Sequence, residues 1–436
     1  MKVHLIAPAR RENLRSRTVV SVAPPLGLAV LASLTPPEIE VSLTDENLGS
    51  VDFDRPVDLV GISAATHTVS RAYQLADAFR SRGVKVVLGG IHPTALPEEA
   101  VQHADAVVVG EAEEVWPQLL VDLQAGRLQT VYRHPERPVL INTPTPRRDL
   151  FQRDGYLFPD TISTTRGCPN GCAFCSVTSF FGGTYRSRPV EDVLGEVNAL
   201  AGRLVFFVDD NIAAHRGRTR QLFSGLARNK LSWIGQASVS IARDEDLLAS
   251  AAASGCLALF LGIESLSRDS LRSVGKHCNL VEEYEEAIRR IHAHGIAVFG
   301  AFIFGLDHDT EDIFELTVQF ARRTRIEGAQ FNILTPYPGT PLHAEFDRDG
   351  RILTRDWSQY RADRVVYAPR GMSASRLQEG HDWAWREFYS LGSIWERVGL
   401  SHPRRLLMWA LNLNYRRDPI SGVLLEALLP WRTRWL

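Results

Sequence analysis

The chain has 436 residues, of which 44% are hydrophobic and 23% charged, and its formal net charge is −2. This composition is typical of a soluble globular protein of two or three domains, and the near-neutral charge gives no reason to expect a nucleic acid as partner. No apolar run of about 18 residues occurs, and the stretch MKVHLIAPAR is too briefly apolar for a signal peptide. Five cysteines, three of them close together, argue against a disulfide framework. We therefore expect a protein of the reducing cytoplasm.

Residues 1–130 alternate apolar runs with helical segments, and this order predicts an α/β domain with a doubly wound, Rossmann-like parallel sheet. The runs are almost continuously apolar, as expected of strands that are buried on both faces. Residues 131–160 are rich in proline and arginine and are predicted to be a linker. The strand candidates of the first domain are KVHLIAP at 2–8, VSLTDEN at 41–47, DLVGISAA at 58–65, KVVLGGIHPT at 85–94 and DAVVVGEAEE at 105–114.

Residues 161–340 begin a second series of strand and helix candidates, which predicts a partial (β/α)6 barrel with its site at the carboxyl ends of the strands. Gly202, Gly255 and Gly295 stand where helices end, just before a strand. Residues 341–436 show no convincing strand after 370 and are predicted to be mostly helical. The strand candidates of the barrel are 161–167, 203–211, 231–240, 257–265, 296–305 and 328–339.

Three cysteines, Cys168, Cys172 and Cys175, follow the first strand of this second series. Thiolates at such spacing bind either zinc or an iron–sulfur cluster, and ligand type alone does not decide between them. A structural zinc site closes with four ligands. Three thiolates on a [4Fe–4S] cluster leave one iron open for a substrate or cofactor. Cys256, between a helix end and an apolar strand, is expected to be buried and inert, and the role of Cys278 stays open.

The spacing C-x3-C-x2-C, with Phe174 before the last cysteine and a βα series after it, resembles the radical S-adenosylmethionine (SAM) superfamily. The resemblance implies that Cys168, Cys172 and Cys175 hold a [4Fe–4S] cluster whose open iron binds SAM. It also implies that an electron from a donor such as flavodoxin or ferredoxin cleaves SAM to a 5′-deoxyadenosyl radical. A zinc loop is the alternative.

The same resemblance implies SAM contacts at the ends of several strands. The segment GIES at 262–265 resembles the part of the family that lies near the SAM ribose, and GAFIFG at 300–305 resembles the strand that contacts adenine. Asp209 and Asp210 could instead be a helix N-cap and its neighbour, and Glu264 could pair with an arginine. The implied SAM contacts are Phe174, Asp209, Asp210, Gln236, Ser238, Glu264, Ile303 and Gly305.

The first domain lacks a G-x-G-x-x-G fingerprint, so a nicotinamide dinucleotide is not supported. A doubly wound sheet binds its ligand at the carboxyl edge of the strands. With the segments PPLGLAVLA and GGIHPTALPEEA, and a radical SAM core after it, residues 1–130 resemble the cobalamin-binding domain of class B radical SAM enzymes. The D-x-H-x-x-G cobalamin motif is absent, which implies a subgroup that holds cobalamin without a histidine ligand on cobalt. The domain could also bind nothing, or adapt the site to its substrate.

The cobalamin contacts that this resemblance implies lie on the loops after three strands. They are Ser63, Thr66, Thr68, Gly89, Gly90, Thr94, Gly110 and Glu111.

Together the two resemblances imply a methyltransferase that acts on an unactivated carbon of a small-molecule or lipid-like biosynthetic intermediate through a 5′-deoxyadenosyl radical. A radical SAM cyclisation, rearrangement or oxidation without methyl transfer, with the first domain as a scaffold, is the alternative. A SAM or cobalamin sensor without turnover is a third hypothesis. On the substrate side, Tyr337 in TPYPGTPLH either faces the substrate or supports the turn.

The last stretch, residues 401–436, carries six arginines together with Trp409, Trp431 and Trp435. A basic amphipathic helix with tryptophan can lie on a membrane surface, which would suit a lipid-like substrate. Alternatively, its leucine-rich face packs against the barrel and closes the open side.

Overall fold

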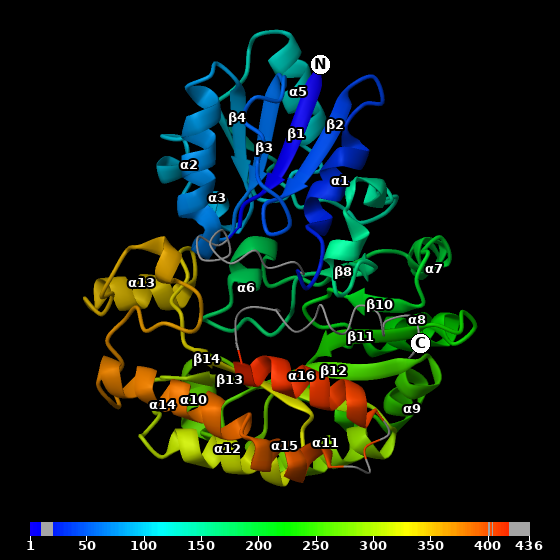
Figure 1. Cartoon of the computed structure of the whole chain (residues 1–436), viewed down its shortest axis with the longest axis vertical. Coiled ribbons are helices and arrows are strands. Elements are labelled where there is room, and N and C mark those ends of the chain that lie inside the picture. Colours follow the sequence, from blue (N-terminus) through cyan, green and yellow to red (C-terminus); the bar gives the residue numbers. More distant parts are fainter. Residues whose placement is uncertain (10–20, 400–401, 403, 418–436) are drawn as a thin grey trace.

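The computed structural model describes residues 1–9, 21–399, 402 and 404–417, and it contains two parallel sheets, one above the other (Figure 1). The first sheet has the strand order β2-β1-β3-β4-β5-β6, and all its neighbouring strands are parallel. Its strands are β1 (Lys2–Ala7), β2 (Glu40–Asp45), β3 (Leu59–Ser63), β4 (Lys85–Gly89), β5 (Ala106–Val109) and β6 (Val131–Arg133).

Helices cover both faces of this sheet, which confirms the doubly wound prediction. On one face α1 (Leu26–Leu34) and α5 (Trp116–Gln124) pack on the strands, and the fully buried Trp116 donates a hydrogen bond to Thr35 Oγ1 over 2.9 Å. On the other face lie α2 (Val69–Arg80), α3 (Ile91–Ala95) and α4 (Pro97–Ala100).

The sheet also includes β6, which lies in the segment that the sequence predicted as a linker. Its central residue Tyr132 is buried in the apolar cluster under α5, and the phenol donates a hydrogen bond to Asp122 Oδ2 over 3.0 Å. The rest of the segment 131–160 contains two short 3-10 turns, Arg148–Leu150 and Arg153–Gly155. This segment packs against the first domain, where the hydroxyl of the buried Tyr156 donates a hydrogen bond to Asp45 Oδ2 over 3.1 Å.

The second sheet is a six-stranded partial barrel, as predicted, with the order β14-β13-β12-β11-β10-β7 and only parallel neighbours. Its strands are β7 (Thr161–Ile162), β10 (Leu204–Phe207), β11 (Ser232–Ala237), β12 (Cys256–Glu264), β13 (Ala297–Phe304) and β14 (Gly328–Ile333). Its outer helices are α7 (Val190–Asn198), α8 (Arg216–Leu226), α9 (Glu245–Ala253), α10 (Arg268–Ser273), α11 (Tyr284–Ala293) and α12 (Ile313–Arg323).

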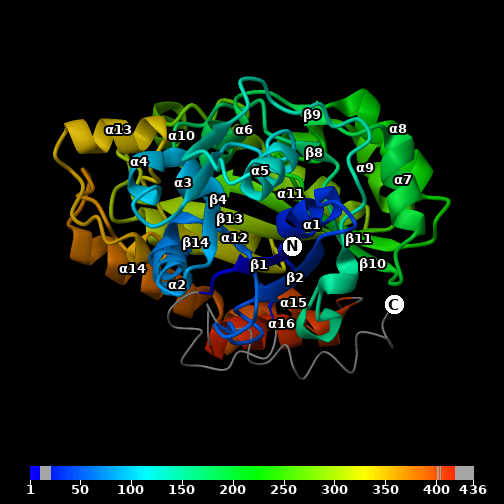
Figure 2. The same cartoon turned by 90° about the horizontal axis from the view of Figure 1, so that it is seen from above.

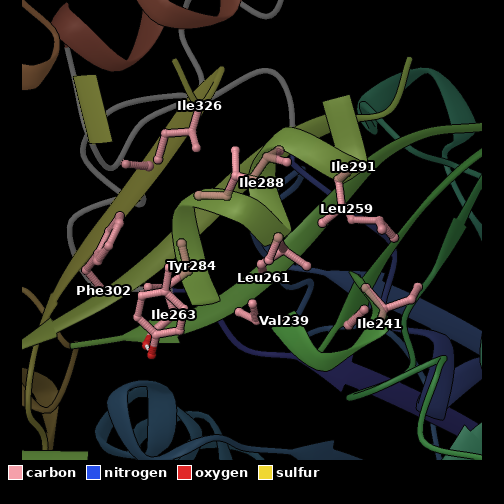
Figure 3. Packing of buried hydrophobic residues seen from close by; sticks show 14 of the residues in the cluster. Val239, Ile241, Leu259, Leu261, Ile263, Tyr284, Ile288, Ile291, Phe302 and Ile326 are labelled. Atoms are coloured by element: carbon pink, nitrogen blue, oxygen red, sulfur yellow. Dashed lines mark hydrogen bonds between the residues drawn. The ribbon is translucent and has the colours of Figure 1, made fainter. Parts of the chain in front are cut away.

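Alternate side chains of β12 point to opposite faces of this sheet. Leu259, Leu261 and Ile263 pack outward against α11, as Figure 3 shows for Ile288 and Ile291. The residues between them face the barrel interior, where the Phe260 ring stacks on the Phe299 ring with 5.0 Å between centroids. Gly262 and Glu264 belong to this inward series, at the carboxyl end of the strand.

The described part of the C-terminal region contains the helices α13 (Pro341–Arg348), α14 (Ala374–Phe388), α15 (Leu391–Val398) and α16 (Arg405–Arg417), with a long connection between α13 and α14. Its last described part packs on the amino end of the barrel. Arg397 donates to the carbonyl of Ile326 over 2.9 Å, Asn412 donates to that of Glu327 over 2.9 Å, and Arg404 donates to that of Leu257. Figure 2 shows α16 on the side of the molecule away from α6 (Ser176–Phe181), which lies in the cysteine loop.

The packing alternative therefore holds for the described part of α16, whose residues Met408 and Trp409 join the apolar cluster under Phe299. Trp431 and Trp435, on which the membrane alternative also depends, lie outside the described residues. None of the described helices combines the length and hydropathy that crossing a bilayer requires.

Candidate active site between the two sheets

The cysteine loop, residues 167–185, lies between two short antiparallel strands, β8 (Thr165–Arg166) and β9 (Arg186–Ser187). It begins at Gly167, whose φ of 84° favours glycine. A Cβ at this position would lie 2.2 Å from the carbonyl oxygen of Thr184, at the other end of the loop. The two ends of the loop can approach so closely only because residue 167 has no side chain.

Asp209, two residues after the end of β10, holds the strand that enters this loop. Its Oδ1 accepts hydrogen bonds from the Thr164 amide over 2.8 Å, from the Thr165 amide, and from Thr165 Oγ1 over 2.7 Å. Its Oδ2 is buried and has no hydrogen-bond partner in the described part of the chain. The N-cap alternative for Asp209 is wrong, because α8 begins later and is capped by His215. Burial and the adjacent Asp209 raise the pKa of Asp210 to about 6.

The three thiols of the loop are free, with Cys172 buried and the other two half-buried. Burial raises the pKa of Cys168, and it raises the pKa of Cys172 to about 12, with Cys175 contributing to both shifts. Buried thiols that raise one another's pKa are good ligands only for a cation that offsets the charge of the thiolates. The donor set therefore fits a metal centre.

Within the described residues, no three His, Cys, Asp or Glu side chains converge on the position of one metal ion. A single tetrahedral zinc ion with bonds of about 2.3 Å would need its thiolates roughly 3.8 Å apart. In a [4Fe–4S] cluster each cysteine binds a different iron, so the sulfurs need not converge in this way.

A buried ion pair faces the thiols from inside the barrel. Glu264 ends β12 with a φ of 65°, and its Oε1 accepts a hydrogen bond from Lys276 Nζ over 2.7 Å. The alternative partner predicted for Glu264 was an arginine, and the structure places a lysine there. A Cβ on Gly262 would lie 2.5 Å from this carboxylate and 3.3 Å from the ammonium, so the pair needs glycine beneath it.

Lys276 reaches the cysteine loop because its segment is bonded to that loop. The amide of Ala173 donates to the carbonyl of Val274 over 3.0 Å. The positive charge of Lys276 lowers the pKa of Cys168 and Cys172, against the larger effect of burial. The sequence prediction missed this residue. The sequence offers only the rarity of lysine, which occurs at four positions of the chain, and rarity alone does not indicate a site.

The remaining predicted SAM residues lie along the same carboxyl edge. Ser238 follows β11, with its hydroxyl 3.8 Å from Cys278 Sγ, so this cysteine belongs to the site region. Cys256, by contrast, is buried at the start of β12, as predicted. The other predicted residues on this side are Phe174, in the cysteine loop, Gln236, on β11, and Ile303, near the end of β13.

Gly305, just after β13, is fixed from two directions. Its amide donates to Asp309 Oδ2 over 3.0 Å, and its carbonyl accepts a hydrogen bond from the Tyr367 hydroxyl over 2.5 Å. With a φ of 88° and the Tyr367 oxygen 2.3 Å from an added Cβ, this position requires glycine. The C-terminal region thus holds the backbone of the predicted adenine segment.

The predicted cobalamin residues lie at the carboxyl ends of β3, β4 and β5 or in the segments that follow them, with Thr66 and Thr68 in a 3-10 helix and Thr94 in α3. Gly90 has a φ of 97°, and an added Cβ would lie 2.7 Å from the carbonyl oxygen of Ala64. Gly110 has a φ of 88° with open space around the Cβ position, and its amide donates to Thr94 Oγ1 over 2.9 Å. Apart from Glu111, the predicted residues at this edge are glycines and short hydroxyl side chains, which present backbone and small polar groups rather than bulky side chains, so the residues fit a corrin.

The neighbouring strands β1 and β3 form the topological switch point of this sheet, where a doubly wound fold binds its ligand. Ser63, at the end of β3, is exposed there, whereas Thr66 and Thr68 are buried and the Thr68 hydroxyl bonds to the backbone of Ala65. The loop after β1, residues 10–20, lies outside the described residues.

The two carboxyl edges meet. Glu111, after β5, accepts hydrogen bonds from Arg166 and Arg186 at the two ends of the cysteine loop, each over 2.6 Å. Gly339, two residues beyond Tyr337, lies against α3 of the first domain, where an added Cβ would be 3.0 Å from Ala95 Cβ. The predicted substrate-side residue is therefore near the boundary between the two domains.

Comparisons with known proteins match both halves of this arrangement. Residues 162–321 match the model of the radical SAM superfamily, and residues 14–120 match that of the B12-binding domain. The structure of the methyltransferase TsrM from Kitasatospora setae, with cobalamin and a [4Fe–4S] cluster bound, has the same fold, with a TM-score of 0.72 at 17% identity over 98% of this chain and 99% of that one. The fold and site thus define a radical SAM enzyme with a B12-binding domain.

Two relatives are similar along most of the chain. Bacteriochlorophyllide d C-12(1)-methyltransferase of Chlorobaculum tepidum is 33% identical over 396 residues, which cover 87% of this chain and 85% of that protein. Anaerobic magnesium-protoporphyrin IX monomethyl ester cyclase of Rubrivivax gelatinosus is 26% identical over 369 residues, which cover 76% of this chain and 66% of that protein. The chain therefore belongs to the class B radical SAM enzymes, and its cofactors are a [4Fe–4S] cluster, SAM and cobalamin.

Proposed function

We propose that this enzyme transfers a methyl group to an unactivated carbon of a small-molecule or lipid-like biosynthetic intermediate. The observation that carries the proposal is that the similarity to a methyltransferase runs through both domains, over 87% of this chain. The contact between the two carboxyl edges supports it, because a methyl donor and a radical must reach the same substrate. When bound, the cofactors supply a 5′-deoxyadenosyl radical and a methyl group.

In this proposal Cys168, Cys172 and Cys175 hold the cluster, and the carboxyl edge of the barrel binds SAM. Burial alone would lower the pKa of Lys276, but the carboxylate of Glu264 raises it above its ordinary value. The ammonium therefore stays charged inside the barrel and attracts negative groups, such as cluster thiolates or the carboxylate of SAM. The Gly305 backbone, held by Asp309 and Tyr367, offers a rigid wall to the adenine.

On the other side, the exposed Ser63 and the glycine turns at Gly89, Gly90 and Gly110 would hold cobalamin. The protein has to keep the reacting groups in register and to exclude water from a reactive radical. Interior rings such as Phe260 and Phe299 fill the barrel below the site, and α16 closes its amino end. The proposed methyl transfer needs no general acid or base from the protein.

The substrate would enter at the boundary between the domains, beside Tyr337. The names of both relatives refer to tetrapyrroles, a bacteriochlorophyllide and a magnesium-protoporphyrin ester. Tetrapyrroles are therefore the first candidates to assay, and polycyclic isoprenoids are the second.

A cyclisation or oxidation without methyl transfer is the second candidate, because the relative from Rubrivivax gelatinosus is named a cyclase. In that case the substrate would lose hydrogen or gain a ring without gaining a carbon atom. A sensor would bind SAM but would not cleave it under reducing conditions.

The test is an anaerobic assay of the reconstituted enzyme with a strong reductant, SAM with a deuterated methyl group, and the two substrate classes in turn. Mass spectrometry should find a product that carries the deuterated methyl, together with 5′-deoxyadenosine. A modified product without the label would replace methyl transfer by the second candidate, and intact SAM in every sample would favour the sensor.

A further inference from the structure

We propose that Glu111 is a positioning residue that fastens the cysteine loop to the cobalamin-binding domain and so sets the separation of the two cofactors. This inference rests on the proposed function, because it assumes that both cofactors act on one substrate. The carboxylate, predicted from sequence as a cobalamin contact, is instead taken up by two arginines of the other domain.

Both oxygens of Glu111 are engaged. Oε2 accepts from Arg166 Nη1 over 2.6 Å and from Arg186 Nη1 over 3.2 Å, and Oε1 accepts from Arg186 Nη2 over 2.6 Å. Arg137 Nη1 is a more distant neighbour, 3.9 Å from Oε1. Arg166 also donates to Glu113, and Arg186 also donates to the carbonyl of Pro138 over 2.8 Å. Glu111 is nevertheless the carboxylate that both arginines share.

The two arginines are cross-strand partners in the β8–β9 pair, Arg166 opposite Arg186. Arg166 is therefore the last residue before the cysteine loop, and Arg186 is the first residue after it. A single carboxylate that binds both of them fixes the base of the loop as a unit. The Cys168 backbone is only two residues from this base, so a shift of the base moves the cluster ligands.

Glu111 is equally close to the other cofactor site. It follows Gly110, whose turn has a φ of 88° and is fixed by the bond from its amide to Thr94. This turn belongs to the glycine edge that we assign to cobalamin. The path from one site to the other thus runs through Gly110, Glu111 and the two arginines.

Burial makes the contact rigid. The exposed fractions of the side chains are 3% for Glu111, 15% for Arg166 and 17% for Arg186. Buried ion pairs with several hydrogen bonds resist separation, because each partner left alone would keep a charge out of water. Reaction rate depends steeply on such geometry, since a misplacement of about 1 Å can cost roughly 100-fold.

The test compares Glu111→Gln with a matched control, Glu196→Gln. Glu196 is also a buried carboxylate between two arginines, 2.5 Å from Arg148 and 2.5 Å from Arg188. Its partner Arg148 belongs to the segment 131–160, so Glu196 also binds outside the barrel, but neither of its partners is at the base of the cysteine loop or on the glycine edge. Glu111→Asp is a second variant that keeps the charge and shortens the reach. All three are prepared as holoenzymes, and iron, sulfide and corrinoid contents are measured first.

The decisive readout is the amount of 5′-deoxyadenosine formed per methylated product. We expect this ratio to rise about tenfold or more in Glu111→Gln, because SAM is still cleaved while the methyl group is misplaced. Glu111→Asp should give an intermediate ratio, and Glu196→Gln should keep the wild-type ratio. If 5′-deoxyadenosine and methylated product fall in parallel in Glu111→Gln, the positioning role is overturned. It is also overturned if Glu196→Gln raises the ratio of the two products as much as Glu111→Gln does.

A second readout separates this inference from the proposed function. Electron paramagnetic resonance of the reduced holoenzyme reports the magnetic interaction between Co(II) and the reduced cluster, and it needs no substrate and no methyl transfer. Glu111→Gln should weaken or broaden this interaction, and Glu196→Gln should not. An unchanged interaction in Glu111→Gln would overturn the inference even if the methyltransferase proposal stands, and a changed one would support it even if that proposal fails.

Discussion

The carboxyl edges of the two sheets are built in different ways. The edge of the barrel is organised by buried charges, such as Asp209 under the cysteine loop and the Glu264–Lys276 pair. The edge of the first sheet is organised mainly by backbone shape, with glycines at positive φ at positions 90 and 110, and its buried charge, Glu111, binds the other domain. A site that must control charged ligands needs fixed charges. A site for a broad, preformed cofactor needs room and rigid turns, and the contrast suggests which substitutions each edge tolerates.

The largest effect is expected from Cys172→Ala, which should remove the cluster and reduce 5′-deoxyadenosine formation to background. Iron, sulfide and SAM cleavage would be measured on anaerobically reconstituted protein. Cys256→Ala, in a strand start away from the site, should keep all three. Corrinoid binding by Cys172→Ala should persist if the two edges bind their ligands independently. Loss of corrinoid binding in this variant would contradict that independence.

Next in size is the effect of Lys276→Met on stability. The substitution leaves the carboxylate of Glu264 buried without its partner, so the free energy of unfolding should fall by about 3–5 kcal/mol. Denaturant unfolding of the apoprotein measures it, with Lys230→Met, at an exposed lysine, as the control. The double variant Lys276→Met with Glu264→Gln should recover part of the loss. A single variant as stable as the control would mean that the barrel edge does not depend on this pair.

At the first edge, Gly90→Ala should cost about 1–3 kcal/mol of unfolding free energy, because alanine there meets both a positive φ and the Ala64 carbonyl. Gly83→Ala is the matched control, since Gly83 has a φ of 82° with nothing near its Cβ position. Titration with a corrinoid should show weaker binding for Gly90→Ala and unchanged binding for Gly83→Ala. Equal affinities in the two variants would remove Gly90 from the cobalamin site.

The smallest effect concerns Glu99, which joins the first domain to Trp357 of the C-terminal region over 3.0 Å. Burial would raise its pKa, but hydrogen bonds from His92, Tyr73 and Trp357 outweigh it and lower the pKa to about 2. The carboxylate thus contributes stability that is present above its ordinary pKa of 4.5 and is lost as pH falls towards 2.

We expect Glu99→Gln to lower the unfolding free energy by about 1 kcal/mol above pH 4.5, a modest value because the side chain is partly exposed. The difference from wild type should shrink as pH falls from 4.5 towards 2. Urea unfolding of both proteins across this range measures it. A difference that grows on acidification would contradict the assignment.

Much of the fold was readable from sequence, because strands buried on both faces leave continuous apolar runs between glycine-terminated helices. Strand β6 was missed because three residues, of which only Tyr132 is buried, carry no periodic signal. The three thiols of the site were readable, since they come from one loop with fixed spacing. Lys276 and the pairing of Glu111 with two arginines were not, because a contact between residues far apart in sequence depends on how β12 and α10, or the two domains, are placed in space.

The central claim is that one chain joins SAM cleavage and methyl donation at a shared site. The most direct measurement is the quantity of 5′-deoxyadenosine and S-adenosylhomocysteine formed in the same anaerobic sample, with substrate and with or without cobalamin. Our account predicts comparable amounts of both, together with methylated product, only when cobalamin is present. Abundant 5′-deoxyadenosine without S-adenosylhomocysteine, at the same level with and without cobalamin, would contradict it.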